Sequence, residues 1–179
     1  MIKLKEIYPI VKDLYYPVDE SVNDFYIRQA VRAFLFRDNK FCLIHITGKD
    51  KFGKRDHYET PGGGVENGED FKESLKREIS EETGYTIKNI KEIGKIAIEY
   101  HLFNRIDVEN FFYAEVDEAH ESHLLDYEKA LFSNYEWFTV DEAINMYQTK
   151  KETTVGKMIH ERDLNALLYL KKFILNAGK

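Results

Sequence analysis

The chain has 179 residues, of which 43% are hydrophobic and 32% are charged. This size and composition are typical of a soluble globular protein with a sizeable core, and we expect a single domain over residues 1–179. The 26 Lys and Arg residues and 32 Asp and Glu residues give a net charge of −6. This charge argues against a general nucleic-acid-binding protein. It leaves room for a small anionic ligand that is bound through a metal.

The single cysteine, Cys42, rules out an intrachain disulfide. Because Cys42 lies in the apolar stretch FCLIHI, we expect a buried thiol on a strand and not a catalytic one. The N-terminal residues lack the apolar run of a signal peptide, and no apolar stretch reaches the roughly 18 residues of a membrane span. We therefore expect a cytoplasmic protein without a membrane partner.

The N-terminal half predicts an extension, a hairpin and a helix. Residues 1–28 are expected to form strand and turn that pack on the domain. Residues 30–46 consist of two apolar runs around Asp38-Asn39, which indicates a β-hairpin. Residues 47–57, TGKDKFGKRDH, are expected to be a polar loop. The chain then passes through PGGG into a helix over residues 70–83.

The second half predicts strands followed by helices. The expected elements are strands over 87–103 and 108–116, an acidic loop over 117–134, a strand over 135–140, a helix over 140–148 and a C-terminal helix over 151–176. The last helix has an apolar face, formed by Val155, Ile159, Leu167, Leu170 and Ile174. This helix either closes the core or forms a homodimer interface. The irregular alternation of strands and helices predicts a mixed β-sheet covered by helices.

The helix over 70–83 carries carboxylates on its apolar stripe. At about 100° per residue, Phe71, Leu75 and Ile79 share one face. Glu78 and Glu82 fall on the same stripe, and Glu81 lies one step round. The opposite, solvent side is formed by Lys72, Glu73, Lys76, Ser80 and Thr83. Carboxylates three or four positions apart repel one another, so a positive group is expected beside them. Arg77 alone cannot neutralise three carboxylates, which favours a hard divalent cation such as Mg²⁺.

The loop before this helix fits a ligand site. Gly62, Gly63 and Gly64 allow positive φ angles and a close approach of the backbone to a ligand. Asp70 and Glu73 have the spacing of an N-terminal capping box. A Walker-type phosphate loop is excluded, because no Gly-Lys-Ser/Thr follows the glycines.

Residues 63–85 resemble the Nudix box, in which a glycine, five residues, a glutamate and seven residues precede the sequence R-E-U-x-E-E-x-G-U, where U is aliphatic. The fixed positions are matched by Gly63, Glu69, Arg77, Glu78, Glu81, Glu82 and Gly84. Tyr85 occupies a position that is usually aliphatic, a departure that affects packing only. The resemblance extends over roughly residues 28–145 through the hairpin, the PGG turn and YEWFTVDEA.

The resemblance implies an α/β/α sandwich and hydrolysis of a nucleoside diphosphate linked to another group, with Mg²⁺ or Mn²⁺ as cofactor. By position, Glu78, Glu81, Glu82 and the carbonyl of Gly62 would hold the metal. Glu78 would also act as general base, with Arg77 orienting it, so Arg77, Glu78 and Glu81 are the expected catalytic residues. Glu69 would support the loop and the helix.

Other sequence features leave alternatives open. Some Nudix members take the base from a later loop, where this chain has Glu118, Glu121 and Glu128. His120 and His123 have a weak metal-like spacing, but no cysteine is nearby and we expect surface histidines. Aromatic residues that either stack on a base or belong to the core are Phe34, Tyr58, Phe103 and Trp137. Lys and Arg residues within 49–55 either meet phosphates or are solvated.

The substrate is less clearly indicated than the reaction. No proline follows Pro61, so the downstream proline of ADP-ribose hydrolases and the proline-rich motif of NADH pyrophosphatases are missing. Tyr100 lies near a tyrosine associated with dinucleoside polyphosphate hydrolases. We expect a nucleoside triphosphate or a related nucleotide as substrate, although Tyr100 is a feature of the dinucleoside polyphosphate alternative. The alternatives are ADP-ribose, a dinucleoside polyphosphate, or a nucleotide-sensing module without hydrolysis.

Overall fold

The structure is a computed structural model that describes residues 10–21, 24–124, 129–150 and 153–177. Its strands are β1 (Tyr26–Arg37), β2 (Lys40–Asp50), β3 (Gly53–Glu59), β4 (Gly62–Gly64), β5 (Tyr85–Tyr100), β6 (Arg105–Ala119) and β7 (Phe132–Phe138). Its helices are α1 (Phe71–Thr83), α3 (Val140–Thr149), α4 (Thr154–Ala177) and a short 3₁₀ helix, His101–Phe103. Within these ranges no helix has both the length and the apolar character needed to cross a membrane.

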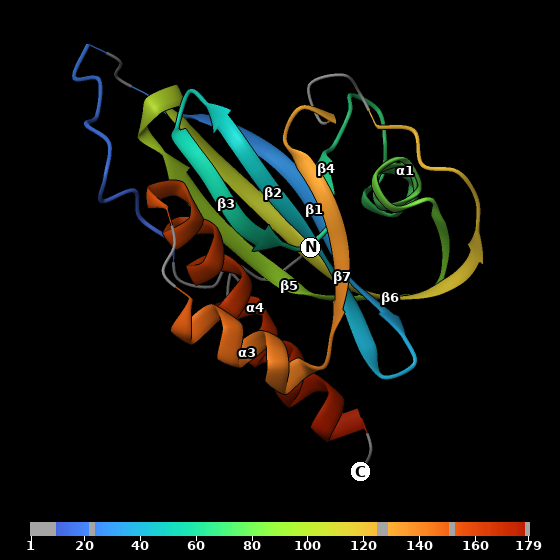
Figure 1. Ribbon diagram of the computed structural model, residues 1–179. Coiled ribbons are helices and arrows are strands. Elements are labelled where there is room, and N and C mark those ends of the chain that lie inside the picture. Colours follow the sequence, from blue (N-terminus) through green and yellow to red (C-terminus); the bar gives the residue numbers. More distant parts are fainter. Residues whose placement is uncertain (1–9, 22–23, 125–128, 151–152, 178–179) are drawn as a thin grey trace.

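The strands form one mixed sheet of order β3-β2-β1-β6-β5, in which β4 also pairs with β1 and β7 with β2 (Figure 1). β1 and β6 run parallel from the pair Tyr26–Arg105 to the pair Phe36–Glu115. The remaining pairs between these strands are antiparallel. β3 pairs with β2, whereas β4 pairs with β1. At Thr60 and Pro61 the chain therefore passes from the side of β2 to the side of β1, the two strands of the first hairpin.

Helices cover both faces of this sheet, with α1 on one face and α3 and α4 on the other (Figure 1). Alternate residues of β1 point to opposite faces, as the pleat of a strand requires. Val31 and Leu35 pack with Leu75 of α1, whereas Phe34 packs with the core that includes Leu167 of α4. The α/β/α sandwich predicted from the sequence is confirmed.

The C-terminal helix closes the second of these cores. Val155, Ile159, Leu167 and Leu170 are all buried there, as the apolar periodicity predicts. The side chain of Ile174 lies outside the described residues. Cys42 is also fully buried, in the core beneath α1.

Local sequence signals account for the first hairpin and for α1. Asp38 and Asn39 have φ angles of 52° and 62°, the positive values that a two-residue hairpin turn of type I′ requires. Asp70 caps α1 by accepting from the backbone N–H groups of Lys72 and Glu73. The side chain of Glu73 accepts in return from the N–H of Asp70, which completes the expected capping box.

Three expectations were wrong in their details. Residues 47–57 are not a loop, because β2 continues to Asp50 and pairs with β3 along its length. The acidic loop expected over residues 117–134 is partly strand, since β6 runs to Ala119 and β7 begins at Phe132. Thr83 is buried and not on the solvent side, and its hydroxyl donates to the carbonyl of Ile79 at 2.6 Å.

The described part of the N-terminal extension packs on the domain through Val11, Asp13 and Tyr16. Val11 is 1% exposed and forms a parallel bridge with Ile98 of β5. Its backbone N–H donates to the carbonyl of Ala97 at 2.8 Å, and its carbonyl accepts from Glu99 at 3.0 Å. The first nine residues, and residues 22 and 23, lie outside the described part of the chain.

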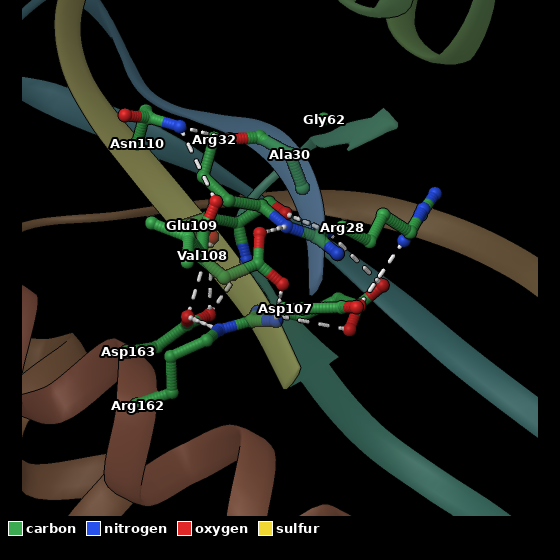
Figure 2. A network of polar contacts seen from close by, with 12 residues as sticks. Arg28, Ala30, Arg32, Gly62, Asp107, Val108, Glu109, Asn110, Arg162 and Asp163 are labelled. Atoms are coloured by element: carbon green, nitrogen blue, oxygen red, sulfur yellow. Dashed lines mark hydrogen bonds and ion pairs between the residues drawn. The ribbon is translucent and has the colours of Figure 1, made fainter. Parts of the chain in front are cut away.

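A set of buried charges joins α4 to the centre of the sheet (Figure 2). Arg162 is fully buried; its Nε donates to Asp163 Oδ1 at 2.7 Å, and its Nη1 donates to Glu109 Oε1 at 3.2 Å. Glu109 Oε2 accepts in turn from Nε of Arg32 at 3.0 Å. Because an isolated buried charge is very costly, these side chains are compatible with the interior only as a connected set.

We predict that Arg162→Met lowers the free energy of unfolding by about 3–5 kcal/mol, because Glu109 and Asp163 remain buried after losing the positive charge that they share. Urea denaturation measures this loss. The matched control is Lys171→Met, since Lys171 pairs with Asp141 at 2.8 Å on the exposed surface. An exposed pair of this kind contributes about 0–1 kcal/mol. Similar losses in the two variants would contradict the prediction.

Candidate functional site

The glycines of the PGGG sequence form β4 and are wedged between β1 and α1. Gly62 has a φ of 140°, and a Cβ atom there would collide with the carbonyl of Val31. A Cβ atom on Gly63 would collide with the carboxylate of Glu78. Glycine is therefore required at position 62, where a side chain would meet the backbone of β1, whereas a side chain at position 63 would displace the carboxylate of Glu78.

Arg77 ties this loop to α1. Its Nε and Nη2 donate to the two carboxylate oxygens of Glu69 at 2.8 and 2.9 Å. Nη2 also donates to the carbonyl of Gly64 at 3.1 Å, and Nη1 donates to Glu78 Oε1 at 2.8 Å. The two-pronged bond to Arg77 lowers the pKa of Glu69 to about 2. Glu69 and Arg77 thus fix the loop and the helix relative to each other.

Glu78, Glu81 and Glu82 lie with Gly62 on the wall of one cavity of about 670 Å³. Glu78 is 8% exposed, and the two other glutamates are partly exposed. Glu82 Oε2 accepts from the N–H of Gly62 at 2.7 Å, and Glu81 Oε2 lies 3.4 Å from Nη1 of Arg77. The structure therefore brings together the carboxylates that the helical periodicity assigns to one stripe.

Burial sets the electrostatics of these glutamates. It raises the pKa of Glu82 well above the ordinary value, even though Arg32 and the N–H of Gly62 lower it. It also raises the pKa of Glu78, against the lowering effect of Arg77. The neighbouring glutamate carboxylates raise both pKa values further. The arginines of the fold thus leave part of this negative charge uncompensated, which favours a bound cation.

The residues present suit a divalent metal by their chemistry. Mg²⁺ prefers carboxylate and carbonyl oxygens, which these glutamates and the glycine loop supply. In the conformation described here, no three His, Cys, Asp or Glu side chains of the described residues are arranged to hold an ion. Glu78 and Glu81 bond to Arg77 instead, and Glu82 bonds to Gly62. A metal would therefore compete with Arg77 for two of its three carboxylates.

Thr60, two residues before Gly62, is held from two sides. Asp163 Oδ2 of α4 accepts from the N–H of Thr60 at 2.8 Å and lies 3.2 Å from its hydroxyl. Arg32 Nη1 of β1 donates to the carbonyl of Thr60 at 3.0 Å. The buried charges beneath the sheet thus fix the chain where it enters the glycine loop.

The rest of the cavity wall combines charged and apolar side chains. Its further charged residues are Arg28, Arg32, Arg55, Arg105, Glu59, Glu66 and Asp107. Its apolar and aromatic residues are Ile46, Phe52, Val65, Tyr100, Leu124, Leu131, Phe132 and Ile159. A cavity of this composition suits a molecule with an anionic part and an apolar part. Sequence reasoning missed Arg28, Glu59 and Asp107, because strand alternation alone does not show which face borders the cavity.

Of the aromatic residues considered from the sequence, only Tyr100 lines this cavity. Phe34 is fully buried between Phe41 and Phe111 of the core. Tyr58, Phe103 and Trp137 lie outside the described cavity lining. Among the basic residues of 49–55, Arg55 lines the cavity, where its Nη2 pairs with Asp50 at 2.6 Å.

The acidic segment after β6 packs on the end of α1. The backbone N–H of His120 donates to the carbonyl of Gly84 at 2.7 Å, and that of His123 donates to the carbonyl of Glu81 at 2.9 Å. Both imidazoles belong to exposed residues, as expected. Glu118 and Glu121 are exposed and outside the cavity lining, and Glu128 lies outside the described residues.

A model of the NUDIX domain family matches residues 27–160, well over half of the chain. The chain belongs to the Nudix family. This membership confirms the resemblance carried by the box and the enzyme class that it indicates, a Nudix-type nucleotide pyrophosphohydrolase. Nudix hydrolases generally need a divalent metal and act on small nucleotide substrates.

Similar proteins carry different names. The NAD-capped RNA hydrolase NudC of Mannheimia succiniciproducens is 44% identical over 50 residues, which are 28% of this chain and only 19% of that protein. A MutT Nudix hydrolase from Burkholderia pseudomallei has a TM-score of 0.57 at 18% identity and covers 75% of this chain and 96% of its own. An ADP compounds hydrolase has a TM-score of 0.64 at 17% identity and covers 84% and 75%. At these identities the solved structures show a shared fold.

We predict that Glu82→Gln stabilises the protein in the absence of metal. The folded pKa of Glu82 lies above the ordinary 4.5, so the folded state holds more protons than the unfolded state. Stability of the natural protein therefore falls as the pH rises above about 4.5, and this loss is absent from the glutamine variant.

Thermal unfolding in EDTA measures this effect. The melting temperature of Glu82→Gln is expected to exceed that of the natural protein by about 2–4 °C near neutral pH. The difference shrinks as the pH falls toward about 4.5. Glu92→Gln, at an exposed position of β5, is the control and shifts little. A glutamine variant that melts lower than the natural protein at neutral pH would contradict the burial argument.

Proposed function

We propose that this chain is a Mg²⁺-dependent pyrophosphohydrolase that cleaves the diphosphate bond of a nucleoside diphosphate linked to another group. Its substrate is a nucleoside triphosphate or a related nucleotide. The observation that carries this proposal is the clustering of Glu78, Glu81 and Glu82 with Gly62 on the wall of one cavity. Mg²⁺ commonly joins a few carboxylates to substrate phosphates, and Mn²⁺ would suit the same ligands.

Glu78, Glu81, Glu82 and the carbonyl of Gly62 hold the metal in this proposal. When bound, such an ion lowers the pKa of a water molecule and neutralises charge on the phosphates. The N–H of Gly62 already anchors Glu82, which keeps this carboxylate at the glycine loop.

In this proposal Glu78 takes the proton from the attacking water, and Arg77 orients Glu78. Arg77 Nη1 donates to Glu78 Oε1 at 2.8 Å, whereas Glu78 Oε2 accepts no hydrogen bond from the described residues. One oxygen of the carboxylate is thus oriented by the arginine, and the other accepts the proton of the attacking water. Arg77 also approaches Glu81, so one guanidinium supports both carboxylates.

The alternatives differ in substrate or in chemistry. ADP-ribose or a dinucleoside polyphosphate would require the same metal site with different contacts in the rest of the cavity. A nucleotide-sensing module would bind without turnover. The chain retains all three box glutamates of α1, which supports hydrolysis over sensing.

We predict that the protein hydrolyses at least one compound in a panel of nucleoside triphosphates, ADP-ribose, nucleoside diphosphate sugars and dinucleoside polyphosphates, and only with Mg²⁺ or Mn²⁺ present. Chromatography of the nucleotide products measures the activity and identifies the bond that is cleaved, and released pyrophosphate or phosphate gives a second readout for the nucleoside triphosphates. Glu82→Gln is expected to lower kcat by about 10²–10⁴-fold. Metal-dependent thermal stabilisation by a nucleotide without any turnover would instead support the sensing module.

A second prediction tests the identity of the base. Glu78→Gln lowers kcat by about 10²–10⁴-fold, because the proton acceptor is lost while the side-chain shape is kept. Glu118→Gln and Glu121→Gln are expected to change kcat less than about twofold, since surface substitutions away from a site have small effects. A large loss in either loop variant, with Glu78→Gln still active, would transfer the base to the loop.

A further inference from the structure

Two arginines on neighbouring strands meet at one buried carboxylate of the cavity wall. Parallel pairing of β1 and β6 sets Arg28 opposite Asp107. Arg28 Nη1 donates to Asp107 Oδ2 at 3.1 Å, as Figure 2 shows, and Nη2 of Arg105 donates to the same oxygen at 3.1 Å. Asp107 is only 2% exposed, and it lines the cavity together with both arginines.

Arg28 and Arg105 have the most exposed side chains among the arginines that line the cavity in the described residues, although Arg77 follows closely at 25%. Arg105 also places its Nε 2.6 Å from Asp107 Oδ1. The side chain of Arg32 is 11% exposed and is used by Glu109 and by backbone. The side chain of Arg55 is 14% exposed, and its Nε and Nη2 both donate to one acceptor. In contrast, the side chains of Arg28 and Arg105 are 33% and 26% exposed. They share one carboxylate, which leaves this pair with a formal charge of +1.

Arg28 of this pair and Glu78 of the glutamate cluster both lie against β4. A Cβ atom on Gly63 would meet the carboxylate of Glu78, and one on Gly64 would meet the guanidinium of Arg28, with Cζ at 3.0 Å. Side chains of consecutive strand residues point to opposite faces, so Glu78 and Arg28 flank β4 from its two sides, and both line the same cavity. The shared cavity makes both groups available to one polyphosphate.

The charge of the cavity supports an additional anion once a metal is bound. Five arginines and six carboxylates of the described residues line it, a formal charge of −1. One divalent cation changes this balance to +1, and the unshared positive charge then lies at the arginine pair. A guanidinium also matches the geometry of a phosphate with two parallel hydrogen bonds.

We propose that Arg28 and Arg105 bind a substrate phosphate that lies outside the diphosphate at the glutamate cluster. The preferred substrate then carries at least three consecutive phosphates, as a nucleoside triphosphate does. This inference rests on the proposed function, since it takes Glu78, Glu81 and Glu82 as the place of the cleaved diphosphate.

Calorimetric binding of inorganic tripolyphosphate and pyrophosphate in Mg²⁺ tests the assignment without turnover of a nucleotide. Arg28→Gln is expected to weaken tripolyphosphate binding about tenfold or more, because a charge-assisted hydrogen bond is lost. Pyrophosphate binding is expected to change less than about twofold, since its two phosphates occupy the glutamate cluster. Arg28→Lys keeps the positive charge but loses the two parallel donors of the guanidinium. Its affinity for tripolyphosphate is expected to lie between that of the natural protein and that of Arg28→Gln.

Arg37→Gln is the matched control, because Arg37 lies on the same strand but outside the described cavity lining. Melting temperatures establish that each variant is folded. Unchanged tripolyphosphate binding by folded Arg28→Gln overturns the proposal. Equal losses for both phosphates also overturn it, since they would assign Arg28 to the diphosphate itself.

Kinetics separate this proposal from the proposed function. With a nucleoside triphosphate, Arg28→Gln is expected to raise KM about tenfold with little change in kcat, whereas the KM for a nucleoside diphosphate sugar stays the same. If no nucleotide is hydrolysed but tripolyphosphate binding depends on Arg28, the proposed function fails and the phosphate site stands. If the natural protein and Arg28→Gln hydrolyse a nucleoside triphosphate with equal KM values, the phosphate site fails and the proposed function stands.

Discussion

The glycine loop depends on a buried set of ion pairs whose members come from distant parts of the chain. Arg32 of β1 and Asp163 of α4 hold Thr60 by its carbonyl and its N–H, and Arg162 and Glu109 connect the two (Figure 2). Loss of one member leaves another charge buried without a partner, so the set persists or fails as a whole. The position of Gly62 is therefore determined by the sheet and α4 as well as by local turn preferences.

The same ion pairs create two kinds of carboxylate within one cavity. Although burial raises the pKa of Glu59, Arg32, His57 and Arg162 together hold it below its ordinary value. Burial raises the pKa of Glu82, whose nearest hydrogen-bond donor is the neutral N–H of Gly62. The charge of Glu59 is thus compensated by arginines of the protein, whereas compensation of the charge of Glu82 requires a cation from solution. This contrast explains how an acidic helix becomes a cation site beside a carboxylate that has a structural role.

Features that depend on short sequence patterns could be predicted, and features that depend on distant partners could not. Asp70, Gly84 and the spacing of the glutamates specify α1 and its acidic stripe, because capping and helical periodicity act within a few residues. The ion pair of Arg28 and Asp107 joins positions 79 residues apart, and no local sequence pattern predicts it. β3 was missed for a related reason. Its polar residues suit an edge strand, and pairing with β2, not apolar alternation, makes it a strand.

The parallel pairing of β1 and β6 also constrains when this protein can fold during synthesis. Tyr26 pairs with Arg105, and Arg162 emerges from the ribosome later still. Closing so long a segment is entropically costly, and contacts of large sequence separation form slowly. Until β6 and α4 have emerged, the edge of β1 is open, and Arg32 and Thr60 lack the groups that hold them. The nascent chain thus exposes one unpaired edge of β1, and dependence on chaperones is concentrated in this interval.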